Sequence, residues 1–172
     1  MPYRGKPLLH HAIARVAAVC GEVVVVLATG ADAGGLPSGV RAAHDPAEGE
    51  GPLAGAHAGL LAAGSSPLAM LVGGDMPELE PAVLRAMLEE VERTGADAVA
   101  LQEGDRARPL PLAVRTGPAA IAAHTLLQNG RRSLHELMHE LRAVEIDEPT
   151  WTALDPGRTT LRDVDEPADL EA

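Results

Sequence analysis

Three aspartates each follow a predicted β-strand, where a carboxylate can help to hold a divalent cation. Asp75 follows the apolar run Leu-Ala-Met-Leu-Val and two glycines, Asp45 follows residues 40–44, and Asp165 follows residues 159–164. In open α/β sheets, ligands bind outside the carboxyl ends of the strands. Mg²⁺ takes one or two protein carboxylates together with phosphate oxygens and waters. We therefore predict a Mg²⁺ site at Asp75, with capping of the next helix as the alternative role for this residue.

A glycine-rich stretch before a predicted helix is a second candidate site. It reads Gly49-Glu50-Gly51-Pro52-Leu53-Ala54-Gly55. The free N–H groups at a helix N-terminus favour anions or polar ligand groups. The stretch matches neither the phosphate-binding P-loop nor the dinucleotide fingerprint. An ordinary glycine-rich loop is therefore the alternative interpretation.

The third pattern is His135-Glu136-Leu137-Met138-His139, which matches the His-Glu-x-x-His helix of zinc peptidases. We interpret the match as accidental, because Glu136 is placed to form a capping box with Ser133. No histidine follows His139 to supply a third ligand. A zinc peptidase is kept as an alternative function.

Composition narrows the class of protein. The chain of 172 residues suits a single domain, residues 1–172, with an aliphatic core, since it has no Phe, one Trp and one Tyr. Its net charge of -11 argues against a nucleic-acid polymer as partner. One cysteine excludes a disulfide framework within the chain. No apolar run approaches the ~20 residues of a membrane span, so we expect a cytoplasmic enzyme or binding domain.

Predicted strands and helices alternate with short links, which indicates a mostly parallel sheet with helices on both faces. The prolines at 109 and 111 suggest that their strand is distorted or lies at an edge. We expect a three-layer, Rossmann-like α/β fold. Helices are predicted at 8–19, 53–63, 81–94, 119–128, 133–141 and 168–171, and strands at 22–29, 40–44, 68–73, 96–101, 110–114, 144–146 and 159–164.

Short motifs follow one another along nearly all of the chain. The most specific are Gly51-Pro52-Leu53-Ala54-Gly55 and Gly74-Asp75-Met76-Pro77, at this separation. The others are Gly5-Lys6-Pro7-Leu8-Leu9, the valine strand ending near Thr29, Asp45, Arg108-Pro109-Leu110, Arg132-Ser133-Leu134 and residues 163–170. In this order they resemble the molybdenum cofactor guanylyltransferase family of the nucleotidyltransferase superfamily.

The resemblance implies transfer of GMP from GTP to molybdopterin cofactor, with release of pyrophosphate and without a protein nucleophile. It implies that Asp75 is the catalytic residue that holds Mg²⁺, and that Asp165 is a possible further metal ligand. Protein partners that handle the cofactor are also possible. The implied nucleotide-binding residues are Thr29, Asp45, Gly51, Pro52, Leu53 and Gly55, and the implied substrate-binding residues are Arg108, Pro109, Arg132 and Ser133.

Two departures from the family pattern affect this prediction. Asp163 and Asp165 stand where the family usually has Asn; acidic versions occur among cytidylyl-transferring relatives, so GTP and CTP both stay open. The family's first strand and its glycine-rich triphosphate loop are missing before Gly5. We therefore expect the natural protein to begin upstream of Met1 and the sheet to lack a central strand. We also expect these 172 residues to bind GTP poorly and to catalyse little or no transfer. A non-catalytic nucleotide-binding relative is the further alternative.

Overall fold

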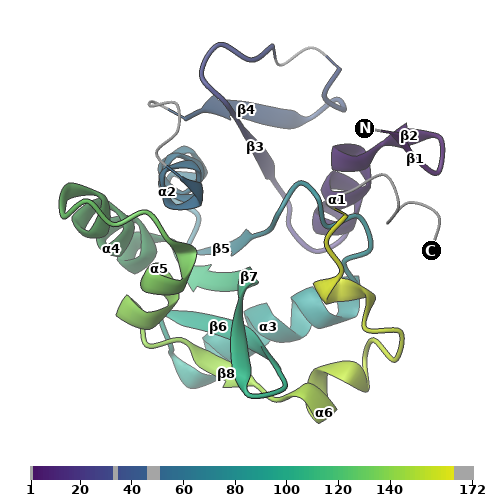
Figure 1. Cartoon of the computed structure of the whole chain (residues 1–172), viewed down its shortest axis with the longest axis vertical. Coiled ribbons are helices and arrows are strands. Elements are labelled where there is room, and N and C mark those ends of the chain that lie inside the picture. The colour runs from purple at the N-terminus through teal and green to yellow at the C-terminus, as the bar shows by residue number, and fades with distance from the viewer. Residues whose placement is uncertain (1, 33–34, 46–50, 165–172) are drawn as a thin grey trace.

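The computed structural model describes residues 2–32, 35–45 and 51–164 (Figure 1). Helices and strands alternate along most of the chain, as the sequence predicts. Their order is β1 (Pro2–Tyr3), β2 (Lys6–Pro7), α1 (Leu8–Ala17), β3 (Val23–Leu27), β4 (Val40–His44), α2 (Pro52–Ala63), β5 (Leu68–Leu71), α3 (Pro81–Thr94), β6 (Ala98–Glu103), β7 (Arg106–Arg115), α4 (Thr116–Gln128), α5 (Leu134–Glu140), β8 (Val144–Ile146), α6 (Glu148–Thr152) and the 3₁₀ helix η1 (Thr159–Leu161).

The strands form a small hairpin and two larger sheets that lie apart (Figure 1). In one sheet β3 and β4 are parallel, from Val23 opposite Val40 to Leu27 opposite His44. The other has the order β5-β7-β6-β8. Its strands β5, β6 and β8 run in one direction, and β7 is antiparallel to both of its neighbours. The predicted α/β fold is confirmed. Within the described ranges, β3 pairs only with β4 and β5 only with β7.

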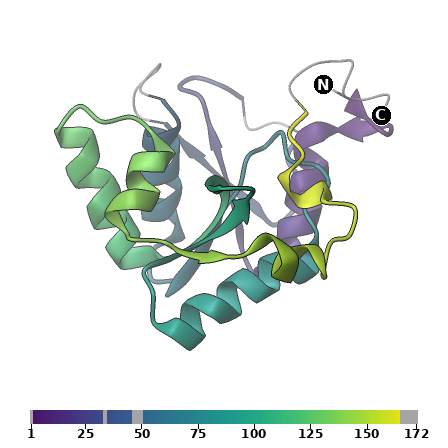
Figure 2. The same ribbon diagram turned by 60° about the horizontal axis from the view of Figure 1, so that its bottom comes forward.

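Two hydrophobic cores cover the two faces of the four-stranded sheet, and the alternation of side chains along β6 divides them. Ala98 and Ala100 face a core shared with α2, α4 and α5. Val99 and Leu101 face the opposite core, which contains the buried residues of α3 and Trp151. Successive strand residues point to opposite faces, so one strand serves both cores. Figure 2 shows α3 on one side of the sheet and α4 and α5 on the other, which gives three layers.

Pro109 and Pro111 were expected to lie in an edge strand or a distorted one, and β7 is not an edge strand because it pairs with both β5 and β6. The predicted distortion is present. Along the ladder with β6, Leu112 pairs with Ala100, and the next pair is Arg108 with Leu101, so residues 109–111 of β7 are skipped. The pairing with β5 ends at Leu112. Both prolines therefore lie where neither ladder pairs residues 109–111, so their missing N–H groups remove no ladder hydrogen bond.

The C-terminal part differs more from the prediction. Residues 159–164 were expected to form a strand, but Thr159–Leu161 is a 3₁₀ helix and α6 precedes it. Asp155 explains the change, because its carboxylate accepts a hydrogen bond from the Thr160 N–H at 2.7 Å and so bends the chain there. The predicted helix at 168–171 lies outside the described residues. Within them, none of the helices has the length and apolar character needed to cross a membrane.

Candidate functional site

A cleft of about 490 Å³ lies between the two sheets and contains several of the predicted site residues. Its walls are aliphatic side chains of α1, β3, α2 and β5. At one end it is lined by Gly73, Gly74 and Asp75, and it also reaches Pro52 and Gly55 at the start of α2. The structure thus brings the predicted metal residue and two predicted nucleotide residues to one concave surface, the usual form of a small-molecule site.

Asp75 lies in the loop between β5 and α3 and is half-buried. Its backbone oxygen accepts a hydrogen bond from the Val164 N–H at 3.0 Å. Its carboxylate folds back over Gly73, where an added Cβ would collide with Oδ1, so the carboxylate occupies the space that glycine leaves open. Asp75 does not cap α3. Glu80 occupies the N-cap position and its side chain accepts from the Ala82 N–H at 3.3 Å.

The residues at this end of the cleft supply one carboxylate, that of Asp75, toward a divalent cation. A carboxylate oxygen is a ligand that Mg²⁺ prefers, and this ion usually keeps one or two protein carboxylates beside phosphate oxygens and water. In the described part of the chain, no three His, Cys, Asp or Glu side chains gather into a complete metal cage. Asp165, the second predicted ligand, lies outside the described residues.

The predicted nucleotide residues meet around the start of α2. The Thr29 hydroxyl donates to the backbone oxygen of Asp45 at 2.7 Å, which ties the loop after β3 to the end of β4. A Cβ on Gly55 would lie 4.0 Å from the Asp45 Oδ2, so that carboxylate lies beside the first turn of α2. Pro52 is the first residue of this helix, where its fixed φ is favourable.

The predicted substrate residues lie on two separate elements. Arg108 of β7 forms ion pairs with Glu103 at 3.1 Å and with Asp163 at 3.2 Å. Ser133 is the N-cap of α5 and forms the predicted capping box with Glu136. Arg132 donates to the backbone oxygens of Leu127 at 3.1 Å and Arg131 at 2.9 Å. Pro109, next to Arg108, is half-buried in β7.

The glutamate of the zinc-peptidase pattern, Glu136, has a structural role in α5. Glu136 completes the capping box and also pairs with Arg131 at 2.6 Å. His135 and His139 are exposed on α5. Since no third ligand joins them among the residues the structure describes, the arrangement gives no support to the zinc alternative.

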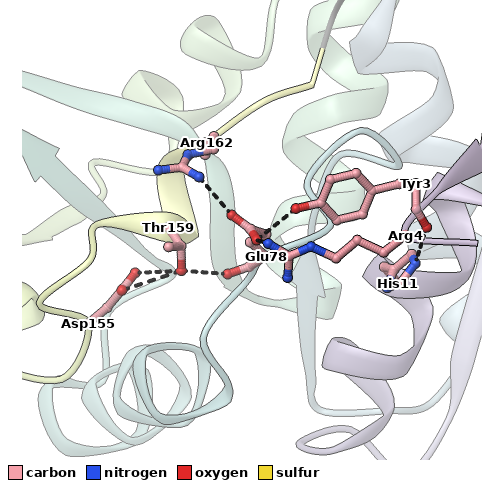
Figure 3. Close-up of polar contacts among 7 residues, drawn as sticks. All are labelled: Tyr3, Arg4, His11, Glu78, Asp155, Thr159 and Arg162. Carbon is pink, nitrogen blue, oxygen red and sulfur yellow. Dashed lines mark hydrogen bonds and ion pairs between the residues drawn. The ribbon is translucent and has the colours of Figure 1, made fainter. Parts of the chain in front are cut away.

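Glu78 is the important residue near the site that sequence reasoning missed. Figure 3 shows Tyr3, Arg4 and Arg162 converging on its carboxylate. Its partners come from both ends of the chain, so no local motif marks it. The only available signal was an acidic residue three positions after Asp75.

Comparisons with known proteins show the family to which the chain belongs. Residues 1–144 match the family of MobA-like NTP transferase domains. A probable molybdenum cofactor guanylyltransferase of Pelotomaculum thermopropionicum is 31% identical over 160 residues, which are 92% of this chain and 76% of that protein. Another, of Chloroflexus aggregans, is 30% identical over 170 residues, which are 98% of this chain and 79% of that protein.

The fold is also shared with a solved structure. Molybdopterin-guanine dinucleotide biosynthesis protein A from Archaeoglobus fulgidus superposes with a TM-score of 0.82 at 23% identity, over 99% of this chain and 85% of that one. The family match covers well over half of the chain. This chain therefore belongs to the family of MobA-like NTP transferase domains and is a nucleotidyltransferase.

Proposed function

We propose that this nucleotidyltransferase moves GMP from GTP to a molybdopterin-type cofactor and releases pyrophosphate. The observation that carries the proposal is the cleft, where Asp75 faces the same hollow as Pro52 and Gly55 of the α2 N-terminus. The guanine nucleotide and the acceptor are taken from the names of the two relatives about 30% identical to the chain.

In this proposal the reaction needs no covalent intermediate with the protein. A phosphate oxygen of the acceptor attacks the α-phosphorus of GTP, and the bond from that phosphorus to the pyrophosphate oxygen breaks. Asp75 would hold Mg²⁺, which when bound neutralises charge on the phosphates. The protein's contribution is then positioning of the reactants and electrostatic stabilisation of the transition state.

The two groups of predicted binding residues divide the reactants between them. Pro52 and Gly55 at the start of α2 line the cleft, and the positive end of the helix dipole there favours an anionic or polar nucleotide group. The nucleotide side consists of Thr29, Asp45, Gly51, Pro52, Leu53 and Gly55. The acceptor side consists of Arg108, Pro109, Arg132 and Ser133, whose guanidinium and hydroxyl groups suit an anionic pterin phosphate.

Slow turnover by these 172 residues is part of the proposal. The sequence contains no Gly-Gly-x-x-x-Arg-Met-Gly segment, the kind of loop whose backbone N–H groups would surround the triphosphate. The described cleft walls are mainly aliphatic. We therefore expect weak GTP binding and design the test for high protein concentration.

The test measures pyrophosphate release from GTP with Mg²⁺ and molybdopterin, for the unchanged chain, Asp75→Asn and Asp105→Asn. Asp105 lies in the exposed turn between β6 and β7, so its variant is the matched control. Asp75→Asn should reduce the rate by about 100-fold or more, as loss of one group that stabilises transition-state charge does. Asp105→Asn should keep the rate.

The other outcomes separate the alternatives. Equal rates for Asp75→Asn and the unchanged chain would contradict the role of Asp75. A preference for CTP would identify a cytidylyltransferase. Binding of Mg²⁺ and GTP without any pyrophosphate release, even at high protein concentration, would identify a non-catalytic nucleotide-binding relative.

A further inference from the structure

The side chain of Glu78 joins three segments that are far apart in the sequence. Its Oε1 accepts a hydrogen bond from the Tyr3 hydroxyl at 2.8 Å and lies 3.0 Å from the Arg4 Nη2. Its Oε2 accepts from the Arg162 Nη1 at 3.0 Å. The Glu78 side chain is 11% exposed. Both carboxylate oxygens are thus occupied, one by the N-terminal hairpin and the other by the segment after η1 (Figure 3).

The backbone around Glu78 is held by the same C-terminal segment. The Thr159 hydroxyl donates to the Glu78 backbone oxygen at 2.9 Å. The Glu80 N–H donates to the Thr160 hydroxyl at 3.1 Å. Residues 78–80 are therefore hydrogen-bonded to η1. A displacement of η1 would displace the loop that carries Asp75.

Glu78 reaches Asp75 by two routes. Along the chain, only two residues, Met76 and Pro77, separate them, and both are buried. Through space, Arg162 is held by the Glu78 carboxylate, and two residues later the Val164 N–H holds the Asp75 backbone oxygen at 3.0 Å. The Glu78–Arg162 ion pair thus fixes the segment that in turn fixes Asp75.

We propose that Glu78 is a positioning residue that sets the place of the Asp75 carboxylate for its metal ion. This inference rests on the proposed function, because it takes Asp75 to be a metal ligand. Residues that hold a ligand without touching the metal affect metal affinity because they fix the ligand's orientation. Glu78 does not line the cleft around Asp75, so its effect is indirect.

The negative charge of Glu78 is the feature that matters. Arg4 and Arg162 both pair with the mostly buried Glu78 carboxylate. If that carboxylate is neutralised, two positive charges remain close together without a compensating negative charge from Glu78. Burial raises the pKa of the Tyr3 phenol, and its hydrogen bond with Glu78 raises it further. Tyr3 therefore stays a neutral donor, and Glu78 is the carboxylate that pairs with both arginines.

The test replaces Glu78 with glutamine, which keeps the size and a hydrogen-bond acceptor for Tyr3 but removes the charge. The matched control is Glu90→Gln, which removes an ion pair with Arg93 on the surface of α3. Binding of Mn²⁺ in the presence of GTP is measured by electron paramagnetic resonance without acceptor, so no turnover is needed. Hydrogen exchange of the amides at residues 73–76 is measured in the free protein.

We expect Glu78→Gln to weaken Mn²⁺ binding roughly ten-fold to 100-fold and to accelerate amide hydrogen exchange at residues 73–76. Glu90→Gln should leave both unchanged. Arg162→Gln, which leaves the Tyr3 and Arg4 contacts with Glu78, should have a smaller effect in the same direction. If Glu78→Gln does not fold, Mn²⁺ binding and amide exchange of Arg162→Gln test the proposal in its place.

The outcomes distinguish the two proposals. If the unchanged chain binds Mn²⁺ with GTP, and Asp75→Asn loses this binding but Glu78→Gln and Arg162→Gln keep it, then the positioning role is wrong and the proposed function stands. If the unchanged chain binds no Mn²⁺ with GTP, or Asp75→Asn binds it equally well, the metal role of Asp75 fails and the positioning role fails with it.

Discussion

Gly51 packs directly against the backbone of Arg132. A Cβ added to Gly51 would lie 3.1 Å from the Arg132 carbonyl oxygen and 3.2 Å from its Cβ. The same carbonyl oxygen accepts a hydrogen bond from the Leu53 N–H at 3.3 Å. This contact connects the start of α2, on the predicted nucleotide side, to the segment before α5, on the predicted acceptor side.

Gly51→Ala should therefore destabilise the protein. Gly51 has φ 79° and ψ 176°, a region essentially restricted to glycine, where another residue costs about 1–3 kcal/mol. The Arg132 contact adds a steric conflict. Gly64→Ala is the control, because Gly64 also lies outside the αL region at positive φ, with φ 60° and ψ -121°, but nothing lies within 4 Å of its Cβ position. Urea unfolding should show a larger loss for Gly51→Ala; equal losses would mean that the Arg132 contact is unimportant.

Asp155 gives a prediction for acid stability. It is 5% exposed and holds η1 through the Thr160 N–H, which donates to its Oδ2 at 2.7 Å. Burial alone would raise the pKa of Asp155, but hydrogen bonds from Thr160 and Thr159 outweigh it and the pKa is lowered. Asp155→Asn should cost about 1–3 kcal/mol at neutral pH, because charge-assisted hydrogen bonds are lost.

The pH dependence of that cost follows from the lowered pKa. A carboxyl whose pKa is lower in the folded state stabilises the fold above its unfolded pKa of about 3.9, and this contribution is lost as the pH falls through the folded value. The difference in free energy of unfolding between the unchanged chain and Asp155→Asn should thus shrink below about pH 4. A difference that stays constant from pH 7 to pH 3 would exclude Asp155 as its source.

Ser133 combines a structural role with a proposed binding role, and two substitutions separate them. Ser133→Ala should cost about 1 kcal/mol by removing the N-cap of α5. Ser133→Asp should restore the stability, because Asp is an equally good N-cap. If the hydroxyl also contacts the acceptor, Ser133→Asp should keep a raised KM for molybdopterin in the pyrophosphate assay. If Ser133→Asp recovers both the stability and the KM of the unchanged chain, Ser133 acts only as the N-cap of α5.

The sequence by itself determined the features that depend on neighbours in the chain. Helix α3 begins at Pro81 and ends at Thr94, the bounds predicted from its apolar spacing with Pro81 near its start. The capping box of Ser133 and Glu136 is present, because its two residues are only three positions apart. The strands at 40–44 and 144–146 also have the predicted bounds.

The tertiary structure alone decided what depends on residues far apart in the chain. β7 is a central strand despite two prolines, because the ladders on both sides leave residues 109–111 without partners. Thr159–Leu161 is a 3₁₀ helix, because buried Asp155 binds its backbone. Glu78 is joined to Tyr3, Arg4 and Arg162 by contacts between the two ends of the chain. Such contacts form only when the whole fold is assembled, and so they leave no local pattern in the sequence.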